Sequence, residues 1–261
     1  MSQRGAPEEP PAPLTGLRGT LGRPTLLEGR ARWELATLKR HPIWDGEGVP
    51  PGEGRAVLLI PGFFAGERSM AAVREWLERC GYAPRRAHLG RNTAPSEHAV
   101  RRLSEELDGL ASERGPVAVI GHSRGGQLGR ALAVRRPDAM GLLATLGAPL
   151  RTMYPPHLFF SASLLVFRAI GRVRRVDIER IREGEAGFEA DLLGPFPEGV
   201  PFVSIWSRLD GFIDWRSSLD PAARSVEVNV SHLGLSGSVA SFRAIADALV
   251  ELSGPAPAAP A

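Results

Sequence analysis

Lysine is almost absent from this 261-residue sequence, and this scarcity decides how its charge is interpreted. Lys39 is the single lysine, so every other basic residue among the 32 is an arginine, balanced by 29 acidic residues. The pI near 9.7 therefore accompanies a formal net charge of only +3. The arginines are scattered, and aromatic residues do not interleave with them as single-strand stacking would require. The composition thus disfavours nucleic acid as a partner.

Cysteine is equally scarce, because Cys80 is the only one. A single cysteine cannot form an internal disulfide, so the cysteine content gives no indication of an oxidising compartment. The cysteine and the histidines do not have the spacing of metal ligands, and we predict no metal site. The N-terminal residues also lack the apolar segment of a signal peptide. From these features we expect a cytoplasmic protein.

Long hydrophobic runs are missing too, although 43% of the residues are hydrophobic, enough to bury a large core. The most apolar segment, "HLFFSASLLVFRAI" (157–170), is shorter than the roughly 20 residues of a membrane span. It could be a core helix. Its position between two expected strands favours instead a helical cap over about 150–197, with Leu164 and Phe167 lining an apolar substrate pocket. Such a cap would also allow transient contact with a lipid interface.

Short apolar runs bounded by turn residues alternate with amphipathic stretches along the rest of the chain. The runs predict buried strands, although periodicity alone would also allow a helix at 141–147. They cover residues 55–60, 117–120, 141–147, 202–206 and 225–230. The stretches 69–81, 96–115 and 238–252 have the apolar spacing or the boundary residues of helices.

This alternation predicts an α/β fold in which helices cover both faces of a mostly parallel sheet. Residues 16–252 would form one domain, with the cap inserted into it. The Pro- and Ala-rich ends, residues 1–15 and 253–261, have too few apolar residues to order themselves, so we expect disordered tails there.

The segment "VAVIGHSRGGQLGRALA" (117–133) contains a G-x-S-x-G motif between an expected strand and an expected helix. In that context the serine occupies a strained turn that exposes its hydroxyl, and the flanking glycines let strand and helix approach each other. A flexible loop serine is the alternative. The strand–turn–helix context favours Ser123 as a nucleophile.

A nucleophilic serine needs a base and an acid that orients the base, in the chain order Ser, Asp or Glu, His. Of the histidines after Ser123, His157 lies in the cap region. His232 follows the last expected strand, which makes it the candidate base. Asp210, on the loop after the preceding strand, is the candidate acid, and Asp214 is the alternative.

Backbone N–H groups for a developing oxyanion are expected from two loops. One donor is Arg124, directly after the nucleophile. The other comes from "PGFFAGE" (61–67), which follows the expected strand 55–60, and is Phe63 or, as an alternative, Phe64. We also expect the Phe64 side chain to contact substrate.

The segments "VLLIPGFFAGERSMAAVREWLERCGY", "VAVIGHSRGGQLGRALAVRRPD", "LATLGAP" and "SIWSRLDGFIDW…VEVNVSHLGL" together resemble bacterial α/β-hydrolase-fold esterases and lipases, especially small triacylglycerol-lipase-like enzymes. The resemblance covers most of 55–252 apart from the cap. It implies hydrolysis of an acyl ester or lipid through an acyl-serine, without a cofactor. The sequence departs from many members in having Pro61-Gly62 where they have His-Gly.

Three functions are compatible with these residues. The first is carboxylester hydrolysis. The second is acyl transfer or thioester hydrolysis, which would use the same three side chains with another acceptor or acyl donor. The third is a scaffold without catalytic activity that binds a membrane or a protein through residues 157–170. Because the chain keeps Ser, Asp and His in order, we favour the hydrolase. The sequence does not define an oligomeric state.

Overall fold

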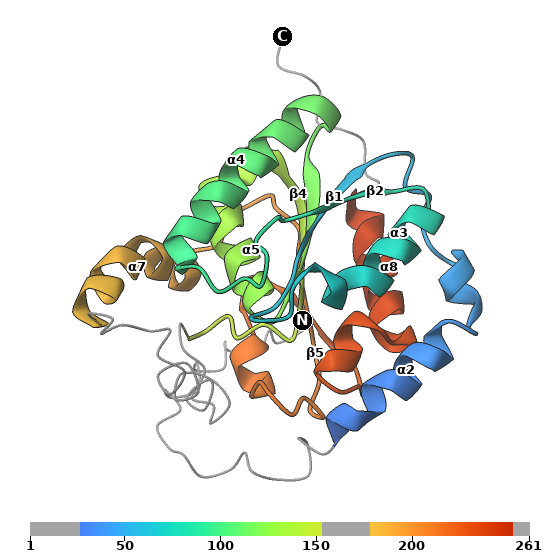
Figure 1. Cartoon of the computed structure of the whole chain (residues 1–261). Helices are drawn as coiled ribbons and strands as arrows, with labels where there is room; N and C mark the ends of the chain where they lie inside the picture. The colour runs from blue at the N-terminus through green and yellow to red at the C-terminus, as the bar shows by residue number, and fades with distance from the viewer. Residues whose placement is uncertain (1–26, 153–177, 253–261) are drawn as a thin grey trace, which may run out of the picture.

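The computed structural model describes residues 27–152 and 178–252, which form a parallel β-sheet between two layers of helices (Figure 1). The strand order is β2-β1-β3-β4-β5-β6, and each neighbouring pair is parallel. The strands are β1 (Ala56–Ile60), β2 (Ala83–Arg86), β3 (Val117–His122), β4 (Met140–Leu146), β5 (Phe202–Trp206) and β6 (Arg224–Glu227). Their carboxyl ends therefore meet at one edge of the sheet, where ligands of open α/β sheets bind. The α/β fold with a parallel sheet, predicted from the sequence, is confirmed.

Burial separates the central strands from the outer ones. Every residue of β1, β3 and β5 is buried, as expected for strands covered on both faces. The ambiguous run at 141–147 is a strand, β4, held between β3 and β5. The outer strand β2 lacks an apolar run, because its residues Ala83–Arg86 include a proline and two exposed arginines. Such a composition suits the edge of a sheet and hides the strand from hydrophobic patterning.

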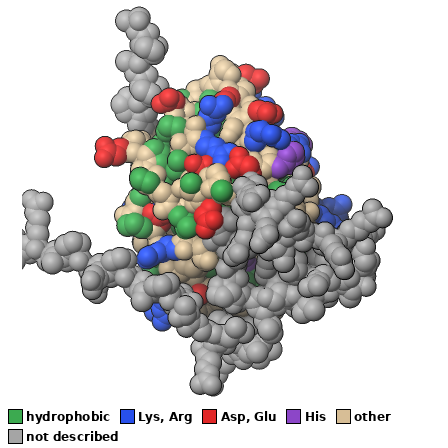
Figure 2. Space-filling view, turned by 90° about the vertical axis from the view of Figure 1, so that its left-hand side faces the viewer, with side chains coloured by type: hydrophobic (Ala, Val, Ile, Leu, Met, Phe, Trp, Pro, Cys, Tyr) green, Lys and Arg blue, Asp and Glu red, His purple; other side chains and the backbone are tan. Residues whose placement is uncertain are grey.

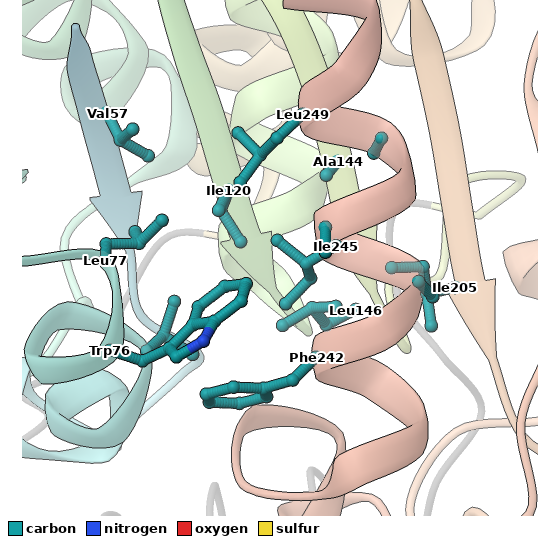
Figure 3. Close-up of a cluster of buried hydrophobic side chains, with 14 of the residues drawn as sticks. Val57, Trp76, Leu77, Ile120, Ala144, Leu146, Ile205, Phe242, Ile245 and Leu249 are labelled. Atoms are coloured by element: carbon teal, nitrogen blue, oxygen red, sulfur yellow. The ribbon is translucent and has the colours of Figure 1, made fainter. Parts of the chain in front are cut away.

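One helical layer consists of α2 (Ala31–Leu38), α3 (Ala71–Arg79) and α8 (Val239–Leu252). Figure 3 shows aromatic side chains of α3 and α8 against the strand residues Ile120 and Leu146. The ring centroids of Trp76 and Phe242 are 4.6 Å apart, and the Trp76 indole N–H donates to the Ile43 carbonyl at 2.7 Å. This buried aromatic pair thus has its one polar N–H satisfied.

The other layer consists of α4 (Ser96–Arg114), α5 (Arg124–Arg135) and α7 (Ile178–Leu193), on the opposite side of the sheet in Figure 1. Phe188 and Leu192 of α7 are buried in this layer. The C-terminal part of the expected cap is therefore core helix where it can be described. Leu164, Phe167 and both expected tails lie outside the described residues.

Short 3-10 helices connect these elements. They are η1 (Glu28–Arg30), η2 (Pro42–Asp45), η3 (Glu67–Met70), η4 (Pro137–Ala139), η5 (Trp215–Ser218) and η6 (Leu233–Ser236). The helix expected from residue 69 begins only at Ala71, because Ser69 belongs to η3 and its hydroxyl donates to the Gly66 carbonyl. Helix α2 was not predicted. It packs against η6 and α8.

On the face shown in Figure 2, basic side chains are interspersed with acidic and hydrophobic ones. Over residues 27–152 and 178–252, no helix has the length and hydrophobicity needed to cross a membrane. Cys80, directly after α3, is partly buried against the core, and burial raises the pKa of its thiol to about 11.

Candidate active site

Ser123 connects β3 to α5 at the carboxyl edge of the sheet. Its φ of 53° and ψ of −123° lie outside the usual regions for a residue with a side chain. The strained backbone is held by two hydrogen bonds. The Ser123 N–H donates to the Leu146 carbonyl at 2.8 Å, and the Ser123 carbonyl accepts from the Gly126 N–H at 2.9 Å. Such strain persists only where the surroundings fix it, and it is common at active sites.

The two glycines of the motif are required by contacts between backbones. A Cβ on Gly121 would lie 2.4 Å from the Gly125 carbonyl oxygen. A Cβ on Gly125 would lie 2.1 Å from the carbonyl oxygen of Ile60 on the neighbouring strand β1. These atoms are backbone and cannot rotate away, so any side chain would force α5 off the sheet. The glycines around Ser123 therefore permit a turn too tight for any other residue type.

Asp210 and His232 meet at the same edge of the sheet. The loop after β5 provides Asp210, and the segment after β6 provides His232. His232 Nδ1 donates to Asp210 Oδ2 at 2.6 Å, and both side chains are buried, with 5% and 2% of their surface exposed. The other oxygen of Asp210 accepts the N–H groups of Phe212 and Ile213 at 2.8 and 2.7 Å. The carboxylate is thus held from both sides.

Asp214, the alternative acid, has a different surrounding. It is the N-cap of η5, and its Oδ1 accepts the Arg216 backbone N–H at 3.0 Å. The geometry therefore pairs His232 with Asp210.

His122 connects the turn at Ser123 to the histidine segment. Its Nε2 donates to the His232 carbonyl at 3.1 Å, and the two imidazole centroids are 4.6 Å apart. Complete burial, together with the neighbouring His232, lowers the pKa of His122 to about 3. His122 is therefore a neutral spacer that fixes the distance between the two loops.

The charges around His232 raise its pKa, whereas the pKa of His122 is lowered. Burial lowers the pKa of His232, but the charge and hydrogen bond of Asp210, with the charge of Glu28, outweigh burial and raise this pKa above its ordinary value. The site thus stabilises the imidazolium form of His232 relative to that of an ordinary histidine, and this form is the state that a general base reaches after accepting a proton.

The loop after β1 lies against Ser123. A Cβ on Gly62 would lie 3.2 Å from the Ser123 Cβ. The half-buried Phe63 and Phe64 follow, with their rings edge to face at 4.5 Å, and Phe64 has a φ of 58°. The loop expected to supply an oxyanion donor is therefore next to the serine, while Arg124, the other expected donor, opens α5.

Asn92 is a residue of this region that the sequence did not indicate. The side-chain amide of Asn92 donates to the Pro61 carbonyl at 2.7 Å. Its backbone carbonyl accepts a hydrogen bond from the Arg124 guanidinium at 2.6 Å. The same guanidinium lies over the Phe63 ring, 5.6 Å from its centroid. Asn92 and the Arg124 side chain thus connect the loop after β1 to the start of α5. A lone asparagine in a loop offers no sequence signal of this function.

Glu28 and Phe212 are two further residues near His232 that the sequence did not indicate. Glu28, in η1, accepts the backbone N–H of His232 at 2.9 Å from a position 204 residues away in the chain. The Phe212 ring meets the His232 imidazole edge to face, with centroids 5.3 Å apart. Neither residue belongs to a motif, so their positions depend on the tertiary fold.

A serine on a tight strand–helix turn, at the same sheet edge as a buried Asp–His pair, is an arrangement of hydrolases on parallel α/β sheets. The family model "Alpha/beta hydrolase family" matches residues 57–255. The chain therefore belongs to the alpha/beta hydrolase family. No curated protein matches the sequence significantly.

Solved structures share the fold at low sequence identity. A structure from the description of LipS and LipT, two metagenome-derived lipolytic enzymes, has a TM-score of 0.55 and 16% identity, covering 79% of this chain and 96% of the other. A putative non-heme bromoperoxidase from Mycobacterium tuberculosis has a TM-score of 0.53 and 16% identity, covering 79% and 94%. A monoglyceride lipase from Saccharomyces cerevisiae has a TM-score of 0.53 and 14% identity, covering 76% and 87%.

Proposed function

We propose that this protein is a serine hydrolase that cleaves carboxylic esters of apolar acyl groups through an acyl-serine intermediate. The observation that carries the proposal is the buried Asp210–His232 pair, with its 2.6 Å hydrogen bond, at the sheet edge where Ser123 is held in a strained turn. Ser123 is the nucleophile, His232 the general base and Asp210 the residue that orients the base.

The hydrogen bond to Asp210 supports Nε2 as the nitrogen of His232 that acts as base. In the neutral ring Nδ1 carries the proton donated to Asp210, so Nε2 carries the lone pair. Nε2 takes the Ser123 proton as the hydroxyl oxygen attacks the ester carbonyl. The imidazolium that forms is stabilised by the Asp210 carboxylate, consistent with the raised pKa of His232. Burial strengthens this interaction, because little water screens it.

The remaining steps use the loop after β1 and the start of α5. The tetrahedral oxyanion accepts the backbone N–H groups of Arg124 and Phe63. As the carbon–oxygen bond of the ester breaks, His232 returns its proton to the departing alcohol. Water then attacks the acyl-serine while His232 accepts a proton from it. As the bond between the acyl carbon and the Ser123 oxygen breaks, His232 returns the proton to that oxygen, and the carboxylic acid leaves.

Aromatic side chains favour an apolar acyl group. Phe63 and Phe64 follow Gly62, which faces Ser123, and Phe212 contacts the His232 ring. All three are half-buried. An acyl chain placed among them would be removed from water, which contributes about 0.8 kcal/mol for each buried methylene group.

The test is hydrolysis of chromogenic acyl esters of increasing chain length by the wild type, Ser123→Ala and Ser112→Ala. Ser112 is an exposed serine on α4 whose hydroxyl bonds to its own helix, so it controls for loss of a serine. We expect the wild type and Ser112→Ala to hydrolyse the esters, and Ser123→Ala to lose at least about 10³-fold in kcat. A wild type inactive on every ester, or an active Ser123→Ala, would refute the proposal.

A further inference from the structure

Two glutamates from the N-terminal segment bind the backbone around His232. Glu28 lies in η1 and Glu34 in α2, and both precede residues 57–255, where the family model matches. They are far from His232 in sequence and reach it only because α2 packs beside η6, the short helix that follows His232.

Glu28 joins the acid loop to the base segment. Its Oε1 accepts the N–H groups of Gly211 and His232, both at 2.9 Å, and its Oε2 accepts the Leu233 N–H at 3.0 Å. Gly211 directly follows Asp210. One carboxylate thus holds the chain next to the acid and at the base, which fixes the two segments relative to each other.

Glu34 holds the other side of His232. It is only 4% exposed, and its two oxygens accept the Ser231 N–H at 3.1 Å and the Ser231 hydroxyl at 2.6 Å. A Cβ on Gly234 would lie 1.9 Å from Glu34 Oε2, so the segment leaves room for this carboxylate. Residues 231, 232 and 233 all have their N–H groups directed to the two glutamates.

Glu28 also contributes charge. Among residues 27–152 and 178–252, the charged and titratable groups that face His232 are Asp210 from the loop after β5, Glu28 from η1 and His122 at the end of β3. Glu34 lies one residue away on Ser231. A negative charge near the ring favours its protonated form. Removing the charge of Glu28 should therefore make His232 release its proton at lower pH.

The following inference rests on the serine hydrolase mechanism proposed above. In that mechanism the geometry points to Glu28 and Glu34 as positioning residues. We infer that Glu28 and Glu34 hold His232 in register with Asp210, and that Glu28 supplies a second negative charge that stabilises the imidazolium. Activity then requires the N-terminal segment to be docked on the sheet edge.

The test compares Glu28→Gln with Glu47→Gln, an exchange at an exposed glutamate of the same N-terminal region. Glutamine has one acceptor oxygen for three N–H donors and no charge. We expect kcat for a short acyl ester to fall about 10- to 100-fold with KM within about two-fold, because only the alignment of the base changes. The acid limb of the kcat/KM profile should move to lower pH. Amide hydrogen exchange at 209–213 and 230–235 should accelerate.

Glu28→Asp separates the charge from the hydrogen bonds and provides a second variant if Glu28→Gln does not fold. The shorter side chain keeps the charge, so the acid limb should stay nearer the wild-type position while exchange at 230–235 still accelerates. Glu34→Gln, which retains an acceptor for Ser231, should lose less activity than Glu28→Gln. A Glu28→Gln variant that matches Glu47→Gln in all three measurements would overturn the inference. The inference would also be overturned if Glu28→Gln lowered the melting temperature but left the acid limb and the hydrogen exchange unchanged, because Glu28 would then act on stability alone.

Failure of this positioning inference can be distinguished from failure of the proposed function. If the wild type cleaves no ester, the hydrolase proposal fails, but hydrogen exchange and titration of the His232 ring by NMR still measure whether Glu28 holds the segment and raises the pKa. If the wild type is active and these two measurements do not respond to Glu28→Gln, the positioning inference alone fails.

Discussion

Asp210 Oδ2 lies 2.6 Å from His232 Nδ1, while Asp210 Oδ1 accepts two backbone N–H groups from its own loop. The two oxygens bind different partners, and the hydrogen bonds at Oδ1 prevent the carboxylate from rotating away from the imidazole. The pair is also almost fully shielded from water. Three expectations follow from this site and its supporting turn.

The first expectation concerns the acid. In Asp210→Asn the side-chain charge is lost and the amide can present its N–H₂ group to Nδ1, which disfavours the tautomer with the lone pair on Nε2. We expect kcat to fall by about 10³- to 10⁴-fold. Asp214→Asn is the matched control, since asparagine also caps a helix well and should leave kcat within about two-fold. Steady-state kinetics of both variants checks this, and a larger loss in Asp214→Asn would exchange the two assignments.

The second expectation concerns the turn at Ser123. Gly125→Ala places a Cβ against the backbone of Ile60, and we expect it to destabilise the fold by more than about 2 kcal/mol and to abolish activity. Gly109→Ala is the control. Gly109 is exposed in the middle of α4 with open space around it, so alanine there should stabilise by about 0.5–1 kcal/mol. Urea unfolding measures both changes. Equal stability of the two variants would contradict the close approach of β1 and α5.

The third expectation concerns acid stability. The pKa of His122 is about 3 in the folded state, compared with 6.5 for an ordinary histidine, which we take for the unfolded state. Between these pH values the folded protein therefore binds fewer protons than the unfolded one. His122 therefore makes the free energy of unfolding fall as pH decreases from about 6.5 towards 3, with a slope of up to about 1.4 kcal/mol per pH unit. Above pH 6.5 this effect is absent.

His122→Gln should flatten that dependence, whereas His88→Gln, at an exposed histidine, should not. His232, whose pKa is raised, contributes in the opposite sense: its stabilisation is fully present below about pH 6.5 and is lost as pH rises through its folded pKa. Because His232 is present in all three proteins, the difference between wild type and His122→Gln reports mainly on His122. Denaturant unfolding between pH 4 and 8 measures it, and parallel curves for the three proteins would refute the burial of a neutral His122.

Much of the fold could be predicted from hydrophobic patterning. The runs that became β1, β3, β4 and β5 are apolar because those strands pair inside a covered sheet. The expected run 225–230 only overlaps β6, an edge strand whose residues are mostly exposed, and its buried Val228 and Val230 follow the strand. Strand β2 escaped because an edge strand with Pro84 and two arginines has no apolar pattern. Helix α2 escaped because it is short, and its packing on η6 and α8 involves partners from the other end of the chain.

The candidate site divides in the same way. Ser123, Asp210 and His232 could be proposed from the sequence because a local motif marks the serine, and the parallel topology fixes where the loops after successive strands meet. The sequence favoured Asp210 as the candidate acid but left Asp214 as an alternative, because both follow β5 on one loop. The structure adds the side-chain directions, which depend on hydrogen bonds within that loop and pair His232 with Asp210.

The sequence by itself determined the alternation of buried strands with helices, the tight turn at Ser123 and the chain order of its expected partners, because these depend on local periodicity and on residue size. Only the tertiary structure decided which polar groups support them. Glu28, Glu34 and Asn92 carry no local signal, and each acts through hydrogen bonds to segments distant in the chain. Such pairings exist only once the sheet and its helices have brought those segments together.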